Sequence, residues 1–230
     1  MKICISILLI LCSILLVSCT NSSNGKDNSS TSEYPPDNRS ILNNDSRLKY
    51  DASIAVTGWV ALFDTNKGKR CYMTHDDYYS IKEPNMNGNL IAEYSFLIPL
   101  GMVLKYSGAH IIWGFDGVEH VNWNDANEYV NGYSPDGKRW RLLSKVEASA
   151  IKSNFYDFVK NSRSYYPNDL KYFGPYWTSS ISNEVWTRKA DNRTYNKVYT
   201  LDIDHDYANI DNEYTIYEKD MLDVYPISSL

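Results

Sequence analysis

The pattern of polar and apolar residues contains two helix starts. Asn122 precedes the first, with Asp125 three residues later, which is typical of a capped first turn. Gly132 then supplies a helix stop. Ser144 begins the second helix, and Glu147 completes an S-x-x-E capping box with it.

The second helix is expected to run from residue 145 to about 160. Four apolar residues recur there at i, i+4, i+7 and i+8: Ile151, Phe155, Phe158 and Val159. This spacing places them on one face, which predicts a helix packed against a sheet. A turn with the sequence Ser134-Pro135-Asp136-Gly137 separates the two helices.

Short runs of β-branched and aromatic residues predict strands along the rest of the chain. These runs lie at 52–63, 70–74, 110–115, 176–180, 184–189, 197–203, 214–217 and 224–227. Residues 64–68 are turn formers, so the first two runs are expected to pair as a hairpin. Residues 89–106 are strongly apolar, but Pro99 and Gly101 interrupt them, which predicts two strands or a strand and an irregular crossing. Residues 75–88 and 161–175 are polar and predict loops. The expected fold is α+β, with two short helices and several short, mostly antiparallel strands.

Three sequence motifs in order resemble the Lcl C-terminal domain family. The matching residues are Trp123, Asp125, Ala126, Tyr129, Gly137, Trp140, Arg141, Leu142, Ser144, Glu147 and residues 176–180. Leu143 stands where the family usually has proline, and residues 224–227 look like its closing strand. The family is grouped with C-type-lectin-like and formylglycine-generating-enzyme-like folds. The resemblance therefore implies a C-type-lectin-like fold over residues 121–230, and it names no ligand.

The first 19 residues are expected to be a targeting segment. Lys2 precedes an apolar run, residues 3–17, that is shorter than the roughly 20 residues of a membrane-spanning helix. The sequence Leu16-Val17-Ser18-Cys19 resembles the lipobox of bacterial lipoproteins. The resemblance implies that Cys19 carries acyl chains such as palmitate, and that the protein is anchored to a bilayer of the bacterial envelope, expected to be the outer membrane. An ordinary secretory signal cleaved elsewhere is the alternative, and the side of the membrane that the domain faces stays open.

Composition divides the rest of the chain into two parts. Residues 20–47 are rich in Asn, Ser and Asp and nearly free of apolar residues up to about residue 44, so they predict a flexible polar tether. Residues 48–230 are expected to form a single domain with a substantial core. The net charge of −5, without a stripe of Lys and Arg, argues against nucleic acid as a partner. Cys71 is the only cysteine of the domain, so an internal disulfide is excluded.

Two acidic patterns are candidates for calcium. Residues 83–85 and 123–125 match the E-P-N and W-N-D motifs of C-type lectins, but they are further apart than in those lectins, and W-N-D fits a helix start better. The second pattern is Asp202, Asp204 and Asp206 with Glu213 at the twelfth position, which nearly matches an EF-hand loop. Tyr207 replaces the glycine of the sharp turn, so a strand ending in an acidic loop is the alternative. No cofactor is otherwise expected.

Catalytic motifs are weak in this sequence. Formylglycine-generating enzymes need cysteines late in the domain, and this chain has none there. The four histidines lack the spacing of a zinc site, and no G-x-S-x-G motif is present. An envelope enzyme with a carboxylate-lined cleft around Asp202, Asp204 and Asp206 stays open as an alternative.

The abundance of 20 tyrosines and six tryptophans suits both sheet packing and recognition surfaces. Trp123, Trp140 and Trp177 occupy motif positions and are expected in the core. Trp59, Trp113 and Trp186 are less constrained and are the candidate ligand-binding residues. The sequence thus predicts an envelope lipoprotein that displays a C-type-lectin-like domain for recognition of, or adhesion to, a glycan or protein. A calcium-dependent sugar binder and an envelope enzyme are the alternatives.

Overall fold

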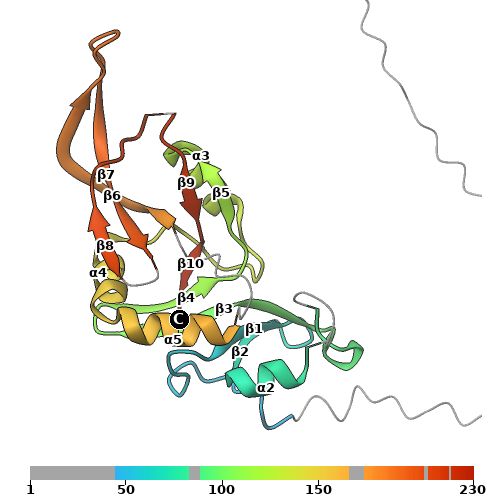
Figure 1. Cartoon of the computed structure of the whole chain (residues 1–230). Helices are drawn as coiled ribbons and strands as arrows, with labels where there is room; N and C mark the ends of the chain where they lie inside the picture. Colours follow the sequence, from blue (N-terminus) through green and yellow to red (C-terminus); the bar gives the residue numbers. More distant parts are fainter. Residues whose placement is uncertain (1–44, 83–88, 166–173, 205–206, 218) are drawn as a thin grey trace, which may run out of the picture. The chain divides into compact units, whose positions relative to one another are not determined.

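The computed structural model describes residues 45–82, 89–165, 174–204, 207–217 and 219–230, all within one unit of the chain (Figure 1). The predicted signal segment with Cys19, most of the predicted tether and the E-P-N motif lie outside these residues. Two sheets and the helices beside them make up the described part, and all strand pairs except the parallel pair β6–β9 are antiparallel, which confirms an α+β class with mostly antiparallel strands.

The first sheet begins with the predicted hairpin. Strand β1 (Val60–Asp64) pairs antiparallel with β2 (Lys69–Met73), and the turn between them lies where the sequence placed it. The prediction of a strand over 52–63 was wrong at its start, because residues 52–58 are mostly turns. Gly58 has a φ of 90°, a conformation that suits glycine and bends the chain before β1.

Strand β3 (Leu97–Tyr106) is continuous through Pro99 and Gly101, so the predicted interruption was wrong. Pro99 is tolerated because β4 (Ala109–Gly114) pairs with β3 only from Gly101 onward, which leaves Pro99 without a strand on that side. On the other side, pairing with β1 shifts register between Ala61 and Leu62, a bulge that absorbs the irregularity.

Strand β10 (Ile227–Ser229) completes the first sheet, whose order is β10-β4-β3-β1-β2. Both faces of this sheet are buried. Val60 and Leu62 point into the main core, whereas Ala61, between them, points into a second cluster that contains Trp140. Burial on both faces explains why these strands are continuous apolar runs rather than alternating ones.

Two short helical segments were not predicted. Helix α2 (His75–Ser80) begins at Thr74, whose side chain accepts a hydrogen bond from the Asp77 backbone N–H, and the 3₁₀ turn η1 (Ala92–Tyr94) precedes β3. Residues 75–88 were predicted to form a loop because their composition is polar, and the helix cap at Thr74 was not identified. Tyr78 is the side chain of α2 that is buried against the core.

The two capped helices are confirmed at their starts. Helix α3 (Trp123–Gly132) begins after Asn122, whose side chain accepts from the Asn124 and Asp125 backbone N–H groups. Helix α4 (Lys145–Ser153) begins with the Ser144–Glu147 capping box. The expected single helix to residue 160 is instead divided, because α4 ends at Asn154 and α5 (Phe155–Tyr165) follows it. Phe155 and Phe158 still reach the main core with Ile151.

The second sheet has the order β5-β9-β6-β7-β8. Its strands are β5 (Val118–Val121), β6 (Gly174–Thr187), β7 (Thr194–Ile203), β8 (Ala208–Asp211) and β9 (Leu222–Val224). The sequence predicted two strands where β6 is one, and it predicted neither β5 nor β8. Residues 214–217 form no regular strand, and the predicted closing strand is divided between β9 and β10, which belong to different sheets.

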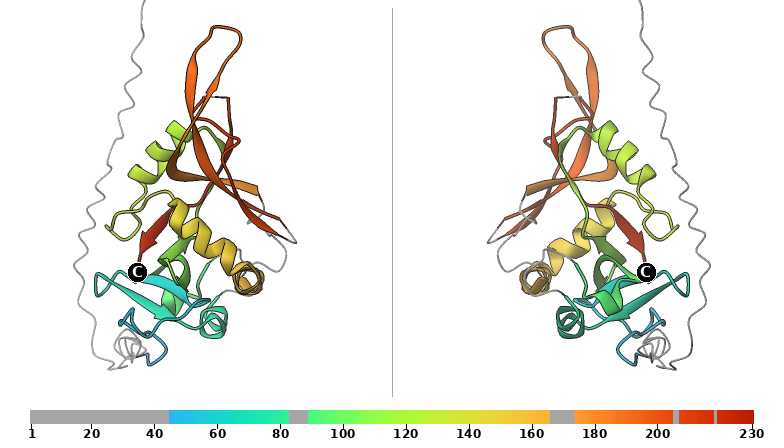
Figure 2. Two further views of the ribbon diagram at one scale, coloured as in Figure 1. Left: turned by 90° about the vertical axis from the view of Figure 1, so that its left-hand side faces the viewer. Right: turned by 90° about the vertical axis from the view of Figure 1, so that its right-hand side faces the viewer.

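Helix α3 packs against β5 and β6, and α4 packs against β7 and β8 as well as β4. The main core lies between the first sheet, α4, α5 and the inner side of β6 and β7. The β6–β7 hairpin projects beyond the rest of the second sheet (Figures 1 and 2). None of the described helices has the length and apolar character needed to cross a membrane.

Candidate functional site

The projecting β6–β7 hairpin carries the candidate site. We call its outer part, residues 182–197 beyond the Ile181–Val198 pair, the arm. Its turn follows from the sequence Lys189-Ala190-Asp191-Asn192. Asn192 has a φ of 57°, and its backbone N–H donates to the Arg188 carbonyl over 2.9 Å, while the Arg188 N–H donates to the Arg193 carbonyl over 2.8 Å. This is a four-residue loop, residues 189–192, with asparagine at the position that needs a left-handed conformation.

Three aromatic side chains gather on one face of the arm, and we call them the arm cluster: Trp186, Tyr195 and Tyr217. Trp186 lies directly opposite Tyr195 in the register of β6 and β7. The ring centroids are 5.9 Å apart for Trp186 and Tyr195, 5.9 Å for Trp186 and Tyr217, and 4.9 Å for Tyr195 and Tyr217. Such spacings are those of rings in direct contact.

The third ring is brought to the arm by a segment that is distant in sequence. Residues 214–217 run beside β7, where the Val198 N–H donates to the Tyr214 carbonyl and the Ile216 N–H donates to the Asn196 carbonyl, both over 3.0 Å. The Tyr217 N–H donates to the Thr215 hydroxyl over 3.1 Å. These bonds fix the Tyr217 backbone, so the cluster is held in place without a ligand.

Charged groups border the arm cluster. The Arg188 guanidinium lies 5.2 Å from the centre of the Tyr217 ring and donates to its hydroxyl over 2.6 Å. Arg188 also pairs with Asp191, and this bond lowers the pKa of Asp191 to about 2. Lys197 pairs with Glu184 over 3.0 Å across the two strands. The cluster therefore offers flat apolar faces with hydrogen-bonding groups at their edges.

The exposure of Trp186 makes this cluster a surface. Its side chain is 39% exposed, and the neighbouring Val185 is 55% exposed. Of the other two candidate tryptophans, Trp113 is only 1% exposed and packs against Phe158 and Tyr176, so it belongs to the core. Trp59 is half-buried against the cluster that holds Trp140. The structure thus brings neither Trp59 nor Trp113 to the arm.

The acidic pattern at 202–213 forms a hairpin. Asp202 lies on β7 opposite Asn209 of β8, and the Asp204 N–H donates to the Tyr207 carbonyl over 2.9 Å. Strands on both sides replace the helices of an EF-hand, and Glu213 follows the end of β8. Within the described residues, no three His, Cys, Asp or Glu side chains are placed to share a metal ion. Asp206 lies outside them, so calcium binding by the four acidic residues stays a prediction.

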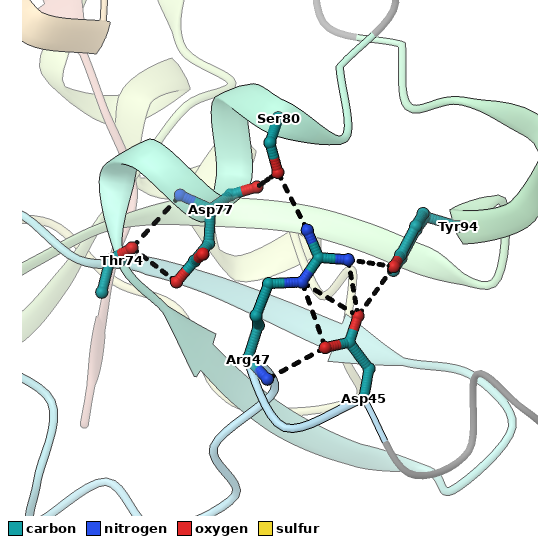
Figure 3. A network of polar contacts seen from close by, with 6 residues as sticks. All are labelled: Asp45, Arg47, Thr74, Asp77, Ser80 and Tyr94. Atoms are coloured by element: carbon teal, nitrogen blue, oxygen red, sulfur yellow. Dashed lines mark hydrogen bonds and ion pairs between the residues drawn. The ribbon is translucent and has the colours of Figure 1, made fainter.

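A polar cluster near the start of the described residues has a structural role: it ties Asp45 and Arg47 to Ser80 and Tyr94 (Figure 3). The Asp45 carboxylate accepts hydrogen bonds from Arg47 over 2.8 Å and from the Tyr94 hydroxyl over 2.7 Å, and Arg47 donates to Ser80 over 2.9 Å. The bond from Arg47 is the main cause that lowers the pKa of Asp45 to about 2. A carboxylate ionised so strongly is poorly suited to move protons near neutral pH.

Cys71 is also unsuited to chemistry. Its thiol is buried on β2, and burial raises its pKa to about 12. The thiolate is the reactive form of cysteine, so this residue is inert in the folded state.

Comparison with known proteins adds no function. No family model matches the chain, and no curated protein matches it. The arm cluster is therefore assigned on geometry. Trp186 was predicted from the sequence as a ligand-binding candidate, whereas Tyr195, Tyr217 and Arg188 were not. The alternation of Trp186 with its neighbours could have suggested Tyr195 as a cross-strand partner, whereas nothing local points to Tyr217.

Proposed function

We propose that this chain is a lipid-anchored protein of the bacterial envelope that recognises a glycan or protein ligand through the arm cluster. The observation that carries the proposal is the set of three contacting aromatic rings, with Trp186 exposed, on a hairpin that projects from the domain. Trp, Tyr and Arg are the residues that most often dominate binding energy at interfaces. Rings already fixed by backbone bonds also lose little entropy when a ligand binds.

The proposed scaffold is a C-type-lectin-like domain of the Lcl C-terminal kind. Its support is the position of the two capped helices: α3 starts at the motif residue Trp123, and α4 starts directly after the motif residue Ser144. Trp140 is 1% exposed, and the Trp123 indole N–H donates to the Thr178 carbonyl over 2.9 Å. Trp123 and Trp140 thus contribute to the packing of the domain, which suits a scaffold role for the motif.

The proposed mode of action is recognition rather than catalysis. Among the described residues, the buried carboxylates Asp136 and Glu147 are held by Arg70 and Arg141 in pairs that tie the fold together. The third buried carboxylate, Asp64, accepts hydrogen bonds from the Tyr50 hydroxyl over 2.6 Å and from the Asn66 N–H over 2.9 Å. The arm projects from the domain and leaves Trp186 exposed, which suits binding to an extended surface more than enclosure of a small substrate.

The test is binding by the full-length protein and by Trp186→Ala, measured on a glycan array and against envelope proteins by crosslinking. Removal of a central interface aromatic costs about 2 kcal/mol or more, so affinity should fall roughly 30-fold. Tyr156→Ala is the matched control, because Tyr156 is an aromatic residue that is 83% exposed on α5, outside the arm. A ligand whose affinity falls equally in both variants, or the lack of any ligand, would contradict the proposal.

A further inference from the structure

The arm has a strand edge whose backbone groups face outward. In an antiparallel pair, hydrogen-bonded and non-hydrogen-bonded positions alternate. Arg188 is a hydrogen-bonded position, because its N–H donates to Arg193. The next pair, Thr187 with Thr194, is therefore non-hydrogen-bonded, and so is Val185 with Asn196 two residues further on. The N–H and C=O groups of Val185 and Thr187 thus point away from β7.

The same alternation of inward-facing and outward-facing backbone groups holds on β7. Asn196, the partner of Val185, directs its carbonyl away from β6, where it accepts from the Ile216 N–H over 3.0 Å. The segment 214–217 therefore covers the outer side of β7. On the outer side of β6, the other strand partner is β9, which pairs with it at Tyr176 and Asp223, far from the arm.

The outer edge of β6 is accessible along the arm. Val185 is 55% exposed, and Thr187 is exposed. In the described ranges, no backbone hydrogen bond beyond the β6–β7 ladder involves Val185 or Thr187. An exposed edge that carries apolar side chains is a template for pairing with another strand.

We propose that this edge pairs with the same edge of a second copy of the chain. The two β6 strands would run antiparallel about a two-fold axis at Trp186. Val185 of each copy would then exchange two backbone hydrogen bonds with Thr187 of the other. Trp186 would lie opposite Trp186 in a non-hydrogen-bonded pair, in which the side chains are closest.

The occupant is a second copy because the charges of the edge are self-complementary. Glu184 and Arg188 lie two residues before and two residues after Trp186, on the same face of the strand. In the two-fold register, Glu184 of each copy faces Arg188 of the other, which gives two opposite-charge pairs at once. Within one copy Glu184 pairs with Lys197, and Arg188 bonds to Asp191 and to the Tyr217 hydroxyl, so the pairs between copies would be made in addition to these bonds or in exchange for them. Glu184 is exposed and Arg188 is half-buried at the side of the strand, so both groups can be approached by a second copy.

Pairing would place two arm clusters next to each other on one face of a four-stranded ribbon, β7-β6-β6-β7. The edge is short, so the contact is smaller than the roughly 1,200 Å² of a stable interface. The dimer is accordingly weak in dilute solution and is favoured where copies share a surface, which raises their effective concentration. The pairing itself does not depend on the ligand of the arm cluster.

Disulfide trapping of the full-length protein tests the register. Cα atoms in a non-hydrogen-bonded pair are about 4.5 Å apart, within reach of a disulfide. Trp186→Cys should therefore form a dimer under mild oxidation, in membranes and at high protein concentration, with the linked peptide identified by mass spectrometry. Thr187→Cys is the matched control, because Thr187 of one copy is offset from Thr187 of the other by more than about 7 Å.

Charge exchange gives a second readout. In the Trp186→Cys background, Glu184→Arg or Arg188→Glu should lower the dimer yield about fivefold, because each variant opposes like charges twice. The double variant Glu184→Arg/Arg188→Glu should restore the yield. The same three variants with Trp186 retained are to be compared by sedimentation, and thermal melting confirms that each is folded.

Three results would overturn the proposal. Equal dimer yields for Trp186→Cys and Thr187→Cys would show random collision. A disulfide from Trp186→Cys to another protein in place of a second copy would assign the edge to a different partner. A double charge variant that remains as weak as the single variants would exclude the two-fold register.

Discussion

Single residues tie distant strands together in this protein, and Asp136 shows how. Its buried carboxylate accepts hydrogen bonds from the Trp140 indole over 2.9 Å and from Arg70 over 2.5 Å. Arg70 also donates to Ser228 over 2.7 Å and to the Ser229 carbonyl. One carboxylate in a turn thus connects β2, the loop before α4 and the last strand, β10.

Asp136→Asn should destabilise the fold strongly. The change removes the charge that Arg70 faces and leaves the guanidinium partly buried without its partner, which costs about 3 kcal/mol. Chemical denaturation at neutral pH measures the loss. Asp76→Asn is the control, because the Asp76 side chain is fully exposed on α2 and its loss should leave the midpoint unchanged. Equal midpoints for the two variants would contradict the structural role of Asp136.

Asp136 should also make the stability of the fold depend on pH. Burial by itself raises the pKa of Asp136, but the hydrogen bonds from Arg70 and Trp140 outweigh it and lower the pKa below the ordinary 3.8. A carboxyl group with a lowered pKa in the folded state adds stability above its unfolded pKa, and this contribution is lost as pH falls through the folded pKa. The difference in stability between the wild type and Asp136→Asn should therefore shrink below about pH 4.

Among the elements, α4 depends most visibly on its N-cap residue, Ser144. The Ser144 hydroxyl accepts from the Glu147 N–H, and the Glu147 carboxylate accepts from the Ser144 N–H over 2.9 Å. Glu147 also pairs with Arg141 over 2.7 Å. The cap thus fixes both the start of the helix and the chain that enters it.

Ser144→Ala should lower the free energy of unfolding by about 1 kcal/mol, the usual loss for an N-cap. Ser149→Ala is the matched control on the same helix. The Ser149 hydroxyl donates to the Lys145 carbonyl, a bond within the helix that adds little stability. Urea denaturation of both variants gives the comparison. The prediction fails if Ser149→Ala costs as much as Ser144→Ala.

For the whole molecule, the proposed anchor makes a separate prediction. Cys19 accepts acyl chains in the lipoprotein hypothesis, and several chains contribute about 0.8 kcal/mol per buried CH₂ to membrane binding. Metabolic labelling with palmitate should mark the wild type and Cys12→Ala, whereas Cys19→Ala should carry no label. Label on Cys19→Ala, or none on the wild type, would contradict the anchor.

Much of the fold was predictable where the signal is local. The caps of Asn122 and Ser144, the hairpin of β1 and β2, and the strand at 110–115 all appear as expected, because their hydrogen bonds join residues a few positions apart. The errors lie where the outcome depends on distant partners. Pro99 stays within β3 because β4 ends opposite Gly101, and the expected long helix is divided at Asn154.

The candidate site, too, was predictable only where its signals are local. Trp186 and the turn at Asp191 and Asn192 are visible in the sequence, since a hairpin needs only short-range signals. The position of Tyr217 beside Tyr195 is not, because it depends on residues 214–217 pairing along β7. Whether a tryptophan is buried is equally non-local, as the contrast between Trp113 and Trp186 shows.

By itself, the sequence determined the class of the fold, the starts of its two main helices and the absence of a disulfide in the domain. Only the tertiary structure decided how β9 and β10 divide between two sheets, which aromatic residues meet, and which edge stays open. The physical reason is the sequence separation of the interacting residues. The hydrogen bonds of helix caps and tight turns join residues only a few positions apart. Burial, cross-strand pairing and ring contacts depend instead on residues that folding alone brings together.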